Sequence, residues 1–434
     1  MEPIAVLVVD DSVVVRRIVT RILSEDPGIR VVGGAASGRS ALEKIEQLAP
    51  DILTLDIEMP EMDGLETLHH LRRLHPRLPV IMFSTLTERA AAATLEAISL
   101  GARDYVTKPG NLGSTGGAFE AVRSQLVPKI KALVPRRPAF REPVRAVPSV
   151  HTWPARSDPH EIVVIGSSTG GPDALATIVR ALPDDLPVPV VIAQHMPPLF
   201  TRLFAQRLDK LSKLTVVEGR PCMPLEPGLV VIAPGDFHLL VVQGQDGPLV
   251  TTNQDARQHG CRPAVDVLFR SAASVFGGRV LACVLTGMGH DGLRGSERLR
   301  AAGAEIVVQD QATSVIWGMP GAIATAGLAD RVLPLPAIAA DLTDAVWRSR
   351  AGAPPGSRLG AGASSLAPRR PTSTTSASWC VDGRRSSWNP ARSTWSSPGC
   401  CRSSRPAGRA ISPGSSPGCA AHQRGPCTRR WSRR

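Results

Sequence analysis

Residues 162–171, IVVIGSSTGG, decide the fold of the second half of the chain. A run of β-branched residues leads into a glycine-rich turn, and Pro172 then opens a sequence typical of a helix. Gly166, Ser168 and Gly170 follow a Gly-x-Ser-x-Gly pattern, in which the glycines let the backbone bend sharply and present one hydroxyl. We therefore interpret Ser168 as a candidate nucleophile. Such a turn can also hold a phosphate, although the dinucleotide and P-loop spacings do not match.

A nucleophilic serine needs a base, and the base needs an acid that orients it. His195 follows the apolar run 188–193, and Asp291 follows the run 280–286. Each of the three residues comes just after a predicted strand, and the carboxyl ends of parallel strands share one crevice. We therefore expect Ser168, His195 and Asp291 to converge. Their order along the chain differs from that of α/β-hydrolases and argues against that fold.

Several other residues remain alternatives for these roles. His238 and His259 are alternative bases, but neither follows an apolar run. Asp266 and Asp310 are alternative acids, and Asp266 lies at a predicted helix start, where capping or an ion pair is expected.

Composition and charge limit the possible functions. The 434 residues are enough for two domains with cores of their own. The net charge of +12 comes from residues 351–434, which hold 14 arginines and one acid, whereas the first 350 residues carry 36 basic and 37 acidic groups. A nearly neutral body does not favour nucleic-acid binding. Only three of the eight cysteines lie before residue 351, and none of these three has a CxxC spacing. With no signal-peptide pattern and no membrane-length apolar run, we expect a cytoplasmic protein without zinc or membrane insertion.

Strands and helices alternate strictly in the first domain, for which we predict residues 1–125. This alternation predicts a parallel sheet covered by helices on both faces, an α/β fold. The predicted strands are 4–10, 30–35, 52–56, 80–85 and 104–109, and the predicted helices are 13–24, 38–48, 64–74, 88–100 and 118–130.

Acidic residues follow these strands in a pattern that indicates metal-assisted phosphoryl chemistry. Asp10 and Asp11 follow the first strand, Asp56 ends the third and Lys108 lies at the end of the fifth. Three carboxylates brought together would repel one another unless a divalent cation offset their charge, and oxygen ligands suit Mg²⁺. Asp56 could then attack a phosphoryl group, and Lys108 could pair with the acyl phosphate. Taken singly, the aspartates could merely cap a helix and the lysine could be surface charge.

Residues 1–125 resemble a response-regulator receiver domain, through the motifs VVDDS (8–12), LDIEMPEMDG (55–64), ST (84–85) and YVTKP (105–109). The resemblance implies a flavodoxin-like fold and phosphorylation of Asp56 by a histidine kinase. It also implies that Ser84 and Tyr105 form the switch pair, with Lys108 beside them.

Residues 126–160 are rich in proline and arginine and are predicted to be a linker. From 161 to 350 the alternation of strands and helices resumes, which predicts a second doubly wound parallel α/β domain. The segments GSSTGG, AQHMP, CRPAVDVLF and LTGMGHDG, behind a receiver, resemble the chemotaxis protein-glutamate methylesterases. The resemblance implies that Ser168, His195 and Asp291 are the catalytic triad and that the Met288 amide is an oxyanion-hole donor. The implied reaction is demethylation and deamidation of chemoreceptors, with no cofactor for the ester step.

Two other kinds of protein remain possible at this point. One is a receiver fused to a degenerate esterase domain that only binds partners, which the filled triad positions disfavour. The other is a hydrolase of the same fold that serves another pathway. Arg262 could contact an acidic substrate surface or pair with Asp266.

Residues 351–434 consist mostly of Ser, Arg, Pro, Gly and Ala, with no lysine and no periodic apolar face. We predict a disordered tail, because such a segment cannot offset the entropy of ordering. It could bind acidic surfaces. Alternatively, the abrupt change in composition could reflect a reading-frame shift.

Overall fold

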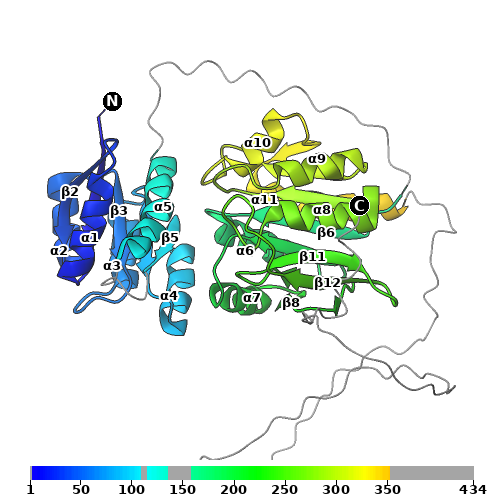
Figure 1. Ribbon diagram of the computed structural model, residues 1–434, viewed down its shortest axis with the longest axis horizontal. Coiled ribbons are helices and arrows are strands. Elements are labelled where there is room, and N and C mark those ends of the chain that lie inside the picture. Colours follow the sequence, from blue (N-terminus) through cyan, green and yellow to red (C-terminus); the bar gives the residue numbers. More distant parts are fainter. Residues whose placement is uncertain (1, 109–114, 135–157, 352–434) are drawn as a thin grey trace, which may run out of the picture. The chain divides into compact units, whose positions relative to one another are not determined.

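The computed structural model describes residues 2–108, 115–134 and 158–351 (Figure 1). Most of the predicted linker and the whole predicted tail beyond Ala351 lie outside these residues. The described residues all belong to one compact unit, Met1–Ala361. Within it, two separate parallel sheets form, as the two predicted α/β domains require.

The first sheet has five parallel strands in the order β2-β1-β3-β4-β5. Its strands are short runs rich in β-branched residues, and the central ones are buried along their whole length, as expected for a sheet covered on both faces. They are β1 (Ile4–Val9), β2 (Ile29–Ala35), β3 (Ile52–Asp56), β4 (Val80–Ser84) and β5 (Asp104–Thr107).

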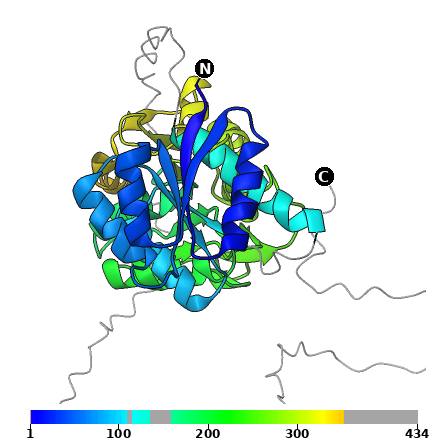
Figure 2. The ribbon, with the colours of Figure 1, turned by 90° about the vertical axis from the view of Figure 1, so that its left-hand side faces the viewer.

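Five helices cover this sheet, and Figure 2 shows them on either side of it. α1 (Val13–Ser24) and α5 (Thr115–Leu133) pack on one face, and the other three pack on the opposite face. Four of the helices begin at a side chain that accepts a hydrogen bond from an amide of the first turn, which fixes where each helix starts. The three helices of the second face are α2 (Gly38–Leu48), α3 (Gly64–Leu74) and α4 (Glu88–Ser99), and the capping residues are Ser12, Ser37, Asp63 and Thr87.

Helix α5 differs from the predicted domain boundary. The linker was expected to begin at residue 126, but α5 continues to Leu133 with Pro128 inside it. Leu126 and Ile130 are fully buried in the core beneath α1 and α5. The sequence predicts the helix only to residue 130, and burial of this apolar face explains why it extends further with a proline inside it.

The second sheet has seven parallel strands in the order β15-β14-β13-β6-β7-β10-β8, and it confirms the predicted doubly wound fold. Its central strands, β6 and β13, are neighbours, so the segments that follow them leave the sheet side by side. The strands are β6 (Ile162–Ser167), β7 (Val190–Gln194), β8 (Thr215–Glu218), β10 (Leu229–Ile232), β13 (Val280–Val284), β14 (Glu305–Gln309) and β15 (Arg331–Leu333).

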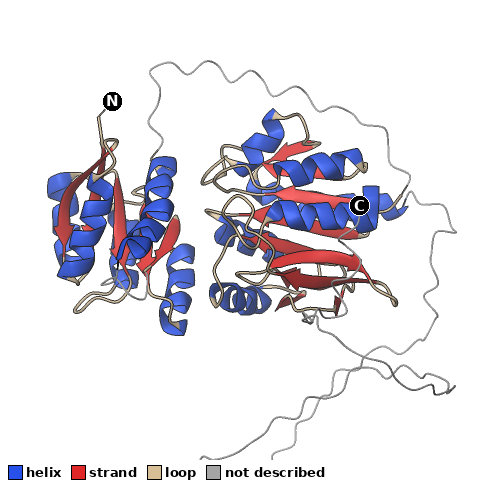
Figure 3. Cartoon of the chain, viewed as in Figure 1, coloured by secondary structure: helices blue, strands red, loops and turns tan. Residues whose placement is uncertain are grey.

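Two hydrophobic cores hold this domain together, one on each face of the sheet. Three helices pack on one face: α6 (Gly171–Ala181), α7 (Phe200–Leu211) and α11 (Leu335–Ala351). Three others pack on the second face: α8 (Val265–Phe276), α9 (Leu293–Ala301) and α10 (Met319–Thr325). Figure 3 shows these helices around the strands.

A small antiparallel sheet departs from the predicted alternation. It contains β9 (Met223–Pro224), β11 (His238–Gln243) and β12 (Pro248–Asn253), in the order β11-β12-β9. The hairpin turn includes Gly247, whose φ of 134° favours glycine. None of the described helices is long and apolar enough to cross a bilayer.

The extent of α5 leads to a stability prediction. Leu126→Ala should lower the free energy of unfolding by about 2–5 kcal/mol, because it leaves a cavity in the receiver core. The neighbouring Gln125 is exposed, so Gln125→Ala should change stability by less than about 0.5 kcal/mol. Urea unfolding of both variants would measure this, and equal small effects would show that residue 126 belongs to a linker.

Candidate functional site

The segment after β6 forms the sharp turn that the glycine pattern predicts. The Ser168 amide donates to the Thr286 carbonyl at 3.1 Å, and the Gly171 amide donates back to the Ser168 carbonyl at 2.8 Å. Gly170 has a φ of 77°, which side chains rarely adopt. A Cβ on Gly166 would lie 2.3 Å from a methyl of Val265, so the backbone can pass here only as glycine.

The structure brings together the three residues predicted as nucleophile, base and acid. Nδ1 of His195 lies 3.1 Å from Oγ of Ser168, and Nε2 lies 2.7 Å from Oδ2 of Asp291. The three residues follow β6, β7 and β13, which are neighbours in the sheet. The result is an unbroken hydrogen-bonded chain from hydroxyl to imidazole to carboxylate.

Asp291 is buried and is held by backbone amides. The amides of Val265, Asp266 and Gly292 donate to its two oxygens at 2.7–2.9 Å. Burial alone would raise the pKa of Asp291, but the hydrogen bonds from His195 and from these amides outweigh it and lower the pKa. Asp291 therefore remains an anion that fixes the orientation of the ring.

The pKa of His195 shifts in the opposite direction to that of Asp291. Burial would lower its pKa, but the hydrogen bond to Asp291, together with Sγ of Cys261 at 3.5 Å from Nδ1, outweighs burial and raises the pKa. The environment therefore favours the imidazolium that forms when the ring accepts a proton.

The loop after β13 contains Met288, whose amide is the predicted oxyanion donor. Gly287 packs against the nucleophile, since a Cβ there would lie 2.9 Å from Cβ of Ser168. The Gly287 amide donates a hydrogen bond to the Ile316 carbonyl. The next amide, that of Met288, donates to no group among the described residues, so it is free to bind a negatively charged oxygen.

The alternative bases and acids have other partners. His238 accepts from the Ala264 amide and contacts the Ala256 carbonyl, so both of its ring nitrogens are occupied. His259 lies 2.9 Å from Asp266 and 4.0 Å from Asp291. Asp310 accepts from Thr313.

Asp266 does not cap its own helix, α8, whose N-cap residue has no side-chain cap hydrogen bond. Its carboxylate instead accepts hydrogen bonds from the Gly292 and Gly295 amides near the start of α9 and contacts His259. His259, Asp266 and Asp291 have the spacing of a metal site. However, these amides and histidines already occupy the carboxylate oxygens, so we interpret the group as a hydrogen-bonded network.

Arg262 does not pair with Asp266, so that possibility was wrong. Its guanidinium lies 2.8 Å from Asp236, which also pairs with Arg257. The reason is that the Asp266 oxygens are taken by the two glycine amides and by His259.

A second polar site lies at the carboxyl ends of the receiver strands. Nζ of Lys108 lies 2.7 Å from a carboxylate oxygen of Asp10 and 2.7 Å from one of Asp56. The exposed Asp11 has an oxygen within 4.8 Å of both. Three carboxylates against one ammonium leave excess negative charge, and their oxygen donors fit Mg²⁺.

Asp56 has a perturbed acidity. Burial, opposed by Lys108 and reinforced by Asp10, raises the pKa of Asp56 to about 6. Gly64 packs against this strand end, where a Cβ would lie 2.1 Å from the Asp56 carbonyl oxygen.

The two predicted switch residues point away from the acidic cluster. The Ser84 hydroxyl accepts from Thr94 at 2.8 Å and lies 3.3 Å from the Ala90 carbonyl, so it faces α4. The Tyr105 ring stacks on Phe200 of α7, with centroids 4.8 Å apart and planes 2° apart.

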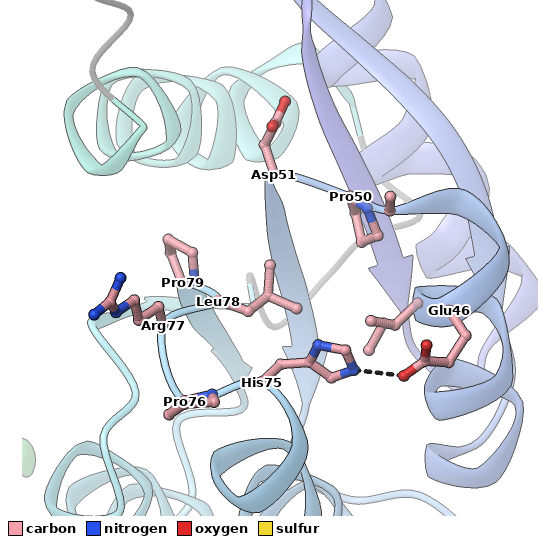
Figure 4. Close-up of a pocket in the computed structure, with 10 residues that line it drawn as sticks. Glu46, Pro50, Asp51, His75, Pro76, Arg77, Leu78 and Pro79 are labelled. Carbon is pink, nitrogen blue, oxygen red and sulfur yellow. Dashed lines mark hydrogen bonds and ion pairs between the residues drawn. The ribbon is translucent and has the colours of Figure 1, made fainter.

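A pocket of about 550 Å³ lies elsewhere, at the opposite end of the receiver sheet (Figure 4). Pro50, Asp51 and Pro79 come from the segments that precede β3 and β4, and His75 pairs there with Glu46. None of the predicted site residues lines it.

The sequence analysis did not identify three side chains that support the loops of the candidate site. Gln194 bridges the segments of Ser168 and His195, Gln309 binds the Thr286 amide, and Cys261 contacts His195. The available signal was a polar residue directly after an apolar run in a strand, which applies to both glutamines.

A receiver fold with an acidic cluster at the carboxyl ends of its strands, followed by an α/β domain with a Ser-His-Asp arrangement, defines a response regulator with a hydrolase output domain. Comparisons with known proteins agree. A model described as CheB methylesterase matches residues 163–342, and one described as response regulator receiver domain matches residues 6–114.

Three similar proteins illustrate the relationship. A Nocardioides sp. protein named protein-glutamate methylesterase/protein-glutamine glutaminase is 52% identical over 366 residues, which cover 83% of this chain and 100% of that protein. A protein of the same name from Trichodesmium erythraeum is 48% identical and covers 79% of this chain and 99% of its own length. The crystal structure of the Thermotoga maritima CheB methylesterase catalytic domain is 41% identical, covers 43% of this chain and 98% of its own, and has a TM-score of 0.42. The chain belongs to the protein-glutamate methylesterase/protein-glutamine glutaminase family, and it is a hydrolase.

The acidity of Asp56 gives a pH prediction. Only the carboxylate is nucleophilic, so phosphorylation should decline as Asp56 becomes protonated, at a pH below the metal-free midpoint of about 6 because bound Mg²⁺ favours the anion. Carboxyl-carbon NMR of the metal-free protein should show Asp56 titrating near pH 6, with Mg²⁺ moving the midpoint lower because the cation favours the anion. A midpoint near the ordinary value of about 4 would contradict the effect of burial.

Proposed function

We propose that the chain hydrolyses glutamyl methyl esters on chemoreceptors through Ser168, His195 and Asp291, and that phosphorylation of Asp56 activates it. The observation that carries the proposal is the unbroken hydrogen-bonded chain from Ser168 through His195 to Asp291. Specific deamidation of receptor glutamines uses the same groups.

The reaction proceeds in two stages. Oγ of Ser168 attacks the ester carbonyl carbon while Nδ1 of His195 takes its proton. The tetrahedral intermediate collapses, and methanol leaves with the proton from Nδ1. Water, deprotonated by the same nitrogen, then attacks the acyl-enzyme, and glutamate leaves as Ser168 recovers its proton. A glutamine side chain follows the same route and releases ammonia.

Two features of the site support these steps. The free Met288 amide lies in the loop beside Ser168, where an oxyanion would form, and one such donor contributes about 3 kcal/mol to transition-state stabilisation. The Asp291 carboxylate stabilises the imidazolium and holds the ring so that Nδ1 faces the hydroxyl.

The receiver has the groups needed to accept a phosphoryl group. We propose that Asp10, Asp11 and Asp56 hold Mg²⁺, that a histidine kinase is the phosphodonor and that Asp56 is the acceptor. The bound cation supplies charge neutralisation for the incoming phosphoryl oxygens. Lys108, already beside Asp56, would pair with the acyl phosphate.

Contacts between receiver residues and the catalytic turn support regulation. The Thr169 hydroxyl, next to Ser168 in the chain, donates to the Asp104 carboxylate at 2.6 Å. Tyr105, the residue after Asp104, stacks on Phe200. We propose that the unphosphorylated receiver restrains the turn and covers it, and that phosphate at Asp56 draws Ser84 inward and lets Tyr105 follow, which releases these contacts.

Two other functions compete with this proposal. A receiver fused to an inactive, partner-binding domain is disfavoured because hydrogen bonds join the proposed nucleophile, base and acid. A hydrolase of the same fold acting on other esters is distinguished by the substrate, so methanol release from methylated receptor helices is the decisive assay.

Ser168→Ala should abolish methanol release while leaving the fold and Asp56 phosphorylation intact, because it removes one hydroxyl on a preformed turn. His195→Ala and Asp291→Asn should lower activity without adding to the Ser168 loss, since the three residues act as a unit. Circular dichroism and phosphorylation would serve as controls. Substantial esterase activity in Ser168→Ala would refute the triad.

Activation should depend on Asp56. A small-molecule phosphodonor with Mg²⁺ should raise kcat/KM of the full chain, whereas Asp56→Asn should show no response because the acceptor is gone. Deleting residues 1 to about 150 should raise basal activity without a phosphodonor, because the restraint on the turn is removed. An isolated esterase domain no faster than the unphosphorylated chain would contradict this regulation.

A further inference from the structure

Two buried glutamines occupy equivalent places on either side of the catalytic strands. Gln194 is the last residue of β7 and Gln309 is the last residue of β14. These strands flank β6 and β13, the central pair whose following segments carry Ser168 and Met288. Both side chains are almost completely buried. A buried amide is retained only if its hydrogen bonds are satisfied, so what each one binds is informative.

Gln194 joins the nucleophile turn to the base loop. Its Nε2 donates to the Ser168 carbonyl at 3.0 Å and to the His195 carbonyl at 3.1 Å, while its Oε1 accepts from the Ser167 hydroxyl at 2.6 Å. The amide therefore fixes the separation of the two backbones that carry Oγ and Nδ1. It does so independently of the hydrogen bond between those two atoms.

Gln309 holds the loop after β13 in place; because this loop carries the Met288 amide, we call it the oxyanion loop. The side-chain amide of Gln309 has the opposite orientation to that of Gln194. Its Oε1 accepts from the Thr286 amide at 2.8 Å, and its Nε2 donates to the Thr313 carbonyl at 2.9 Å. The Thr286 hydroxyl in turn donates to the Thr169 carbonyl at 2.9 Å, which ties the oxyanion loop to the nucleophile turn.

We propose that Gln194 and Gln309 are positioning residues for the hydrolytic reaction, Gln194 for the Ser168–His195 pair and Gln309 for the oxyanion loop. The inference rests on the proposed triad. Neither glutamine touches the substrate. Each holds a catalytic segment within the few tenths of an ångström that proton transfer and oxyanion binding require, and a misplacement of about 1 Å costs about 10²-fold in rate.

Because the two side-chain amides have opposite orientations, the same substitution at both positions can distinguish a positioning role from a general contribution to stability. Gln194 presents a donor to the catalytic backbone, whereas Gln309 presents an acceptor. Glutamate has nearly the shape of glutamine but, when ionised, can only accept. Gln194→Glu therefore loses both bonds to the catalytic segments, and Gln309→Glu keeps its bond to the Thr286 amide. The same substitution should have different consequences at the two positions.

The experiment measures kcat and KM for methanol release from methylated receptor helices by the full chain, with Mg²⁺ and a phosphodonor, between pH 6 and pH 9. Gln194→Glu should lower kcat about 10²-fold at pH 8 with little change in KM. Its activity relative to the unsubstituted protein should recover as the pH falls, because the protonated side chain regains one donor. Gln309→Glu should lose less than about tenfold across the range.

Three further variants keep the test decisive. Ser271→Ala removes a buried hydroxyl that binds the Val241 amide at 3.0 Å, away from the catalytic loops, and should lower Tm without changing kcat. Should Gln194→Glu fail to fold, Gln194→Met and Ser167→Ala replace it, with expected losses in kcat of about 10²-fold and about fivefold.

Activity losses that are equal at the two glutamines, or that simply follow the fall in Tm, would overturn the proposal, as would full activity of Gln194→Glu at pH 8. Ser168→Ala is measured in parallel. Residual activity in that variant refutes the triad itself, whereas a silent Gln194 beside an inactive Ser168→Ala refutes only the positioning role.

Discussion

The buried carboxylate of Asp291 is the group on which the catalytic site depends. An ionised carboxylate away from water is costly unless hydrogen bonds and an opposite charge compensate it. Here the amides at the start of α8 and after β13 provide the hydrogen bonds, and His195 provides the charge when it is protonated. The backbone amides therefore stabilise the Asp291 carboxylate, and that carboxylate in turn orients His195.

The same principle organises the receiver, with a different outcome. Asp10 and Asp56 are also buried at the ends of parallel strands, but each accepts from one backbone amide, and a single lysine stands between the two carboxylates. The compensation is incomplete, and the pKa of Asp56 is raised rather than lowered. A carboxylate that is left partly uncompensated favours a cation, whereas a fully satisfied one, such as Asp291, serves as a fixed acceptor.

Hydrogen bonds to backbone groups set the geometry around both sites. The catalytic turn is held by Thr286, Gln194 and the glycines that allow close approach, so the nucleophile is placed before any substrate arrives. Thr169 extends this network to Asp104, which gives the receiver a direct contact with the residue after the nucleophile. Preorganisation and the proposed regulation therefore involve the same short segment.

The sequence by itself determined most of the elements and which three residues converge at the candidate site. α1, α2, α3 and β3 begin and end where the sequence predicts, because capping residues and apolar periodicity are local signals. The convergence of Ser168, His195 and Asp291 also followed, because parallel strands bring their carboxyl ends to one edge.

Only the tertiary structure decided which side chains pair across the chain. Arg262 binds Asp236 because Asp266 is already occupied, and α5 extends beyond residue 130, its predicted end, where Leu133 packs against the receiver core. The Gln194 and Gln309 amides took opposite orientations because one faces carbonyl groups and the other faces an amide. These outcomes depend on groups more than ten residues apart competing for the same partners, and no local pattern in the sequence records that competition.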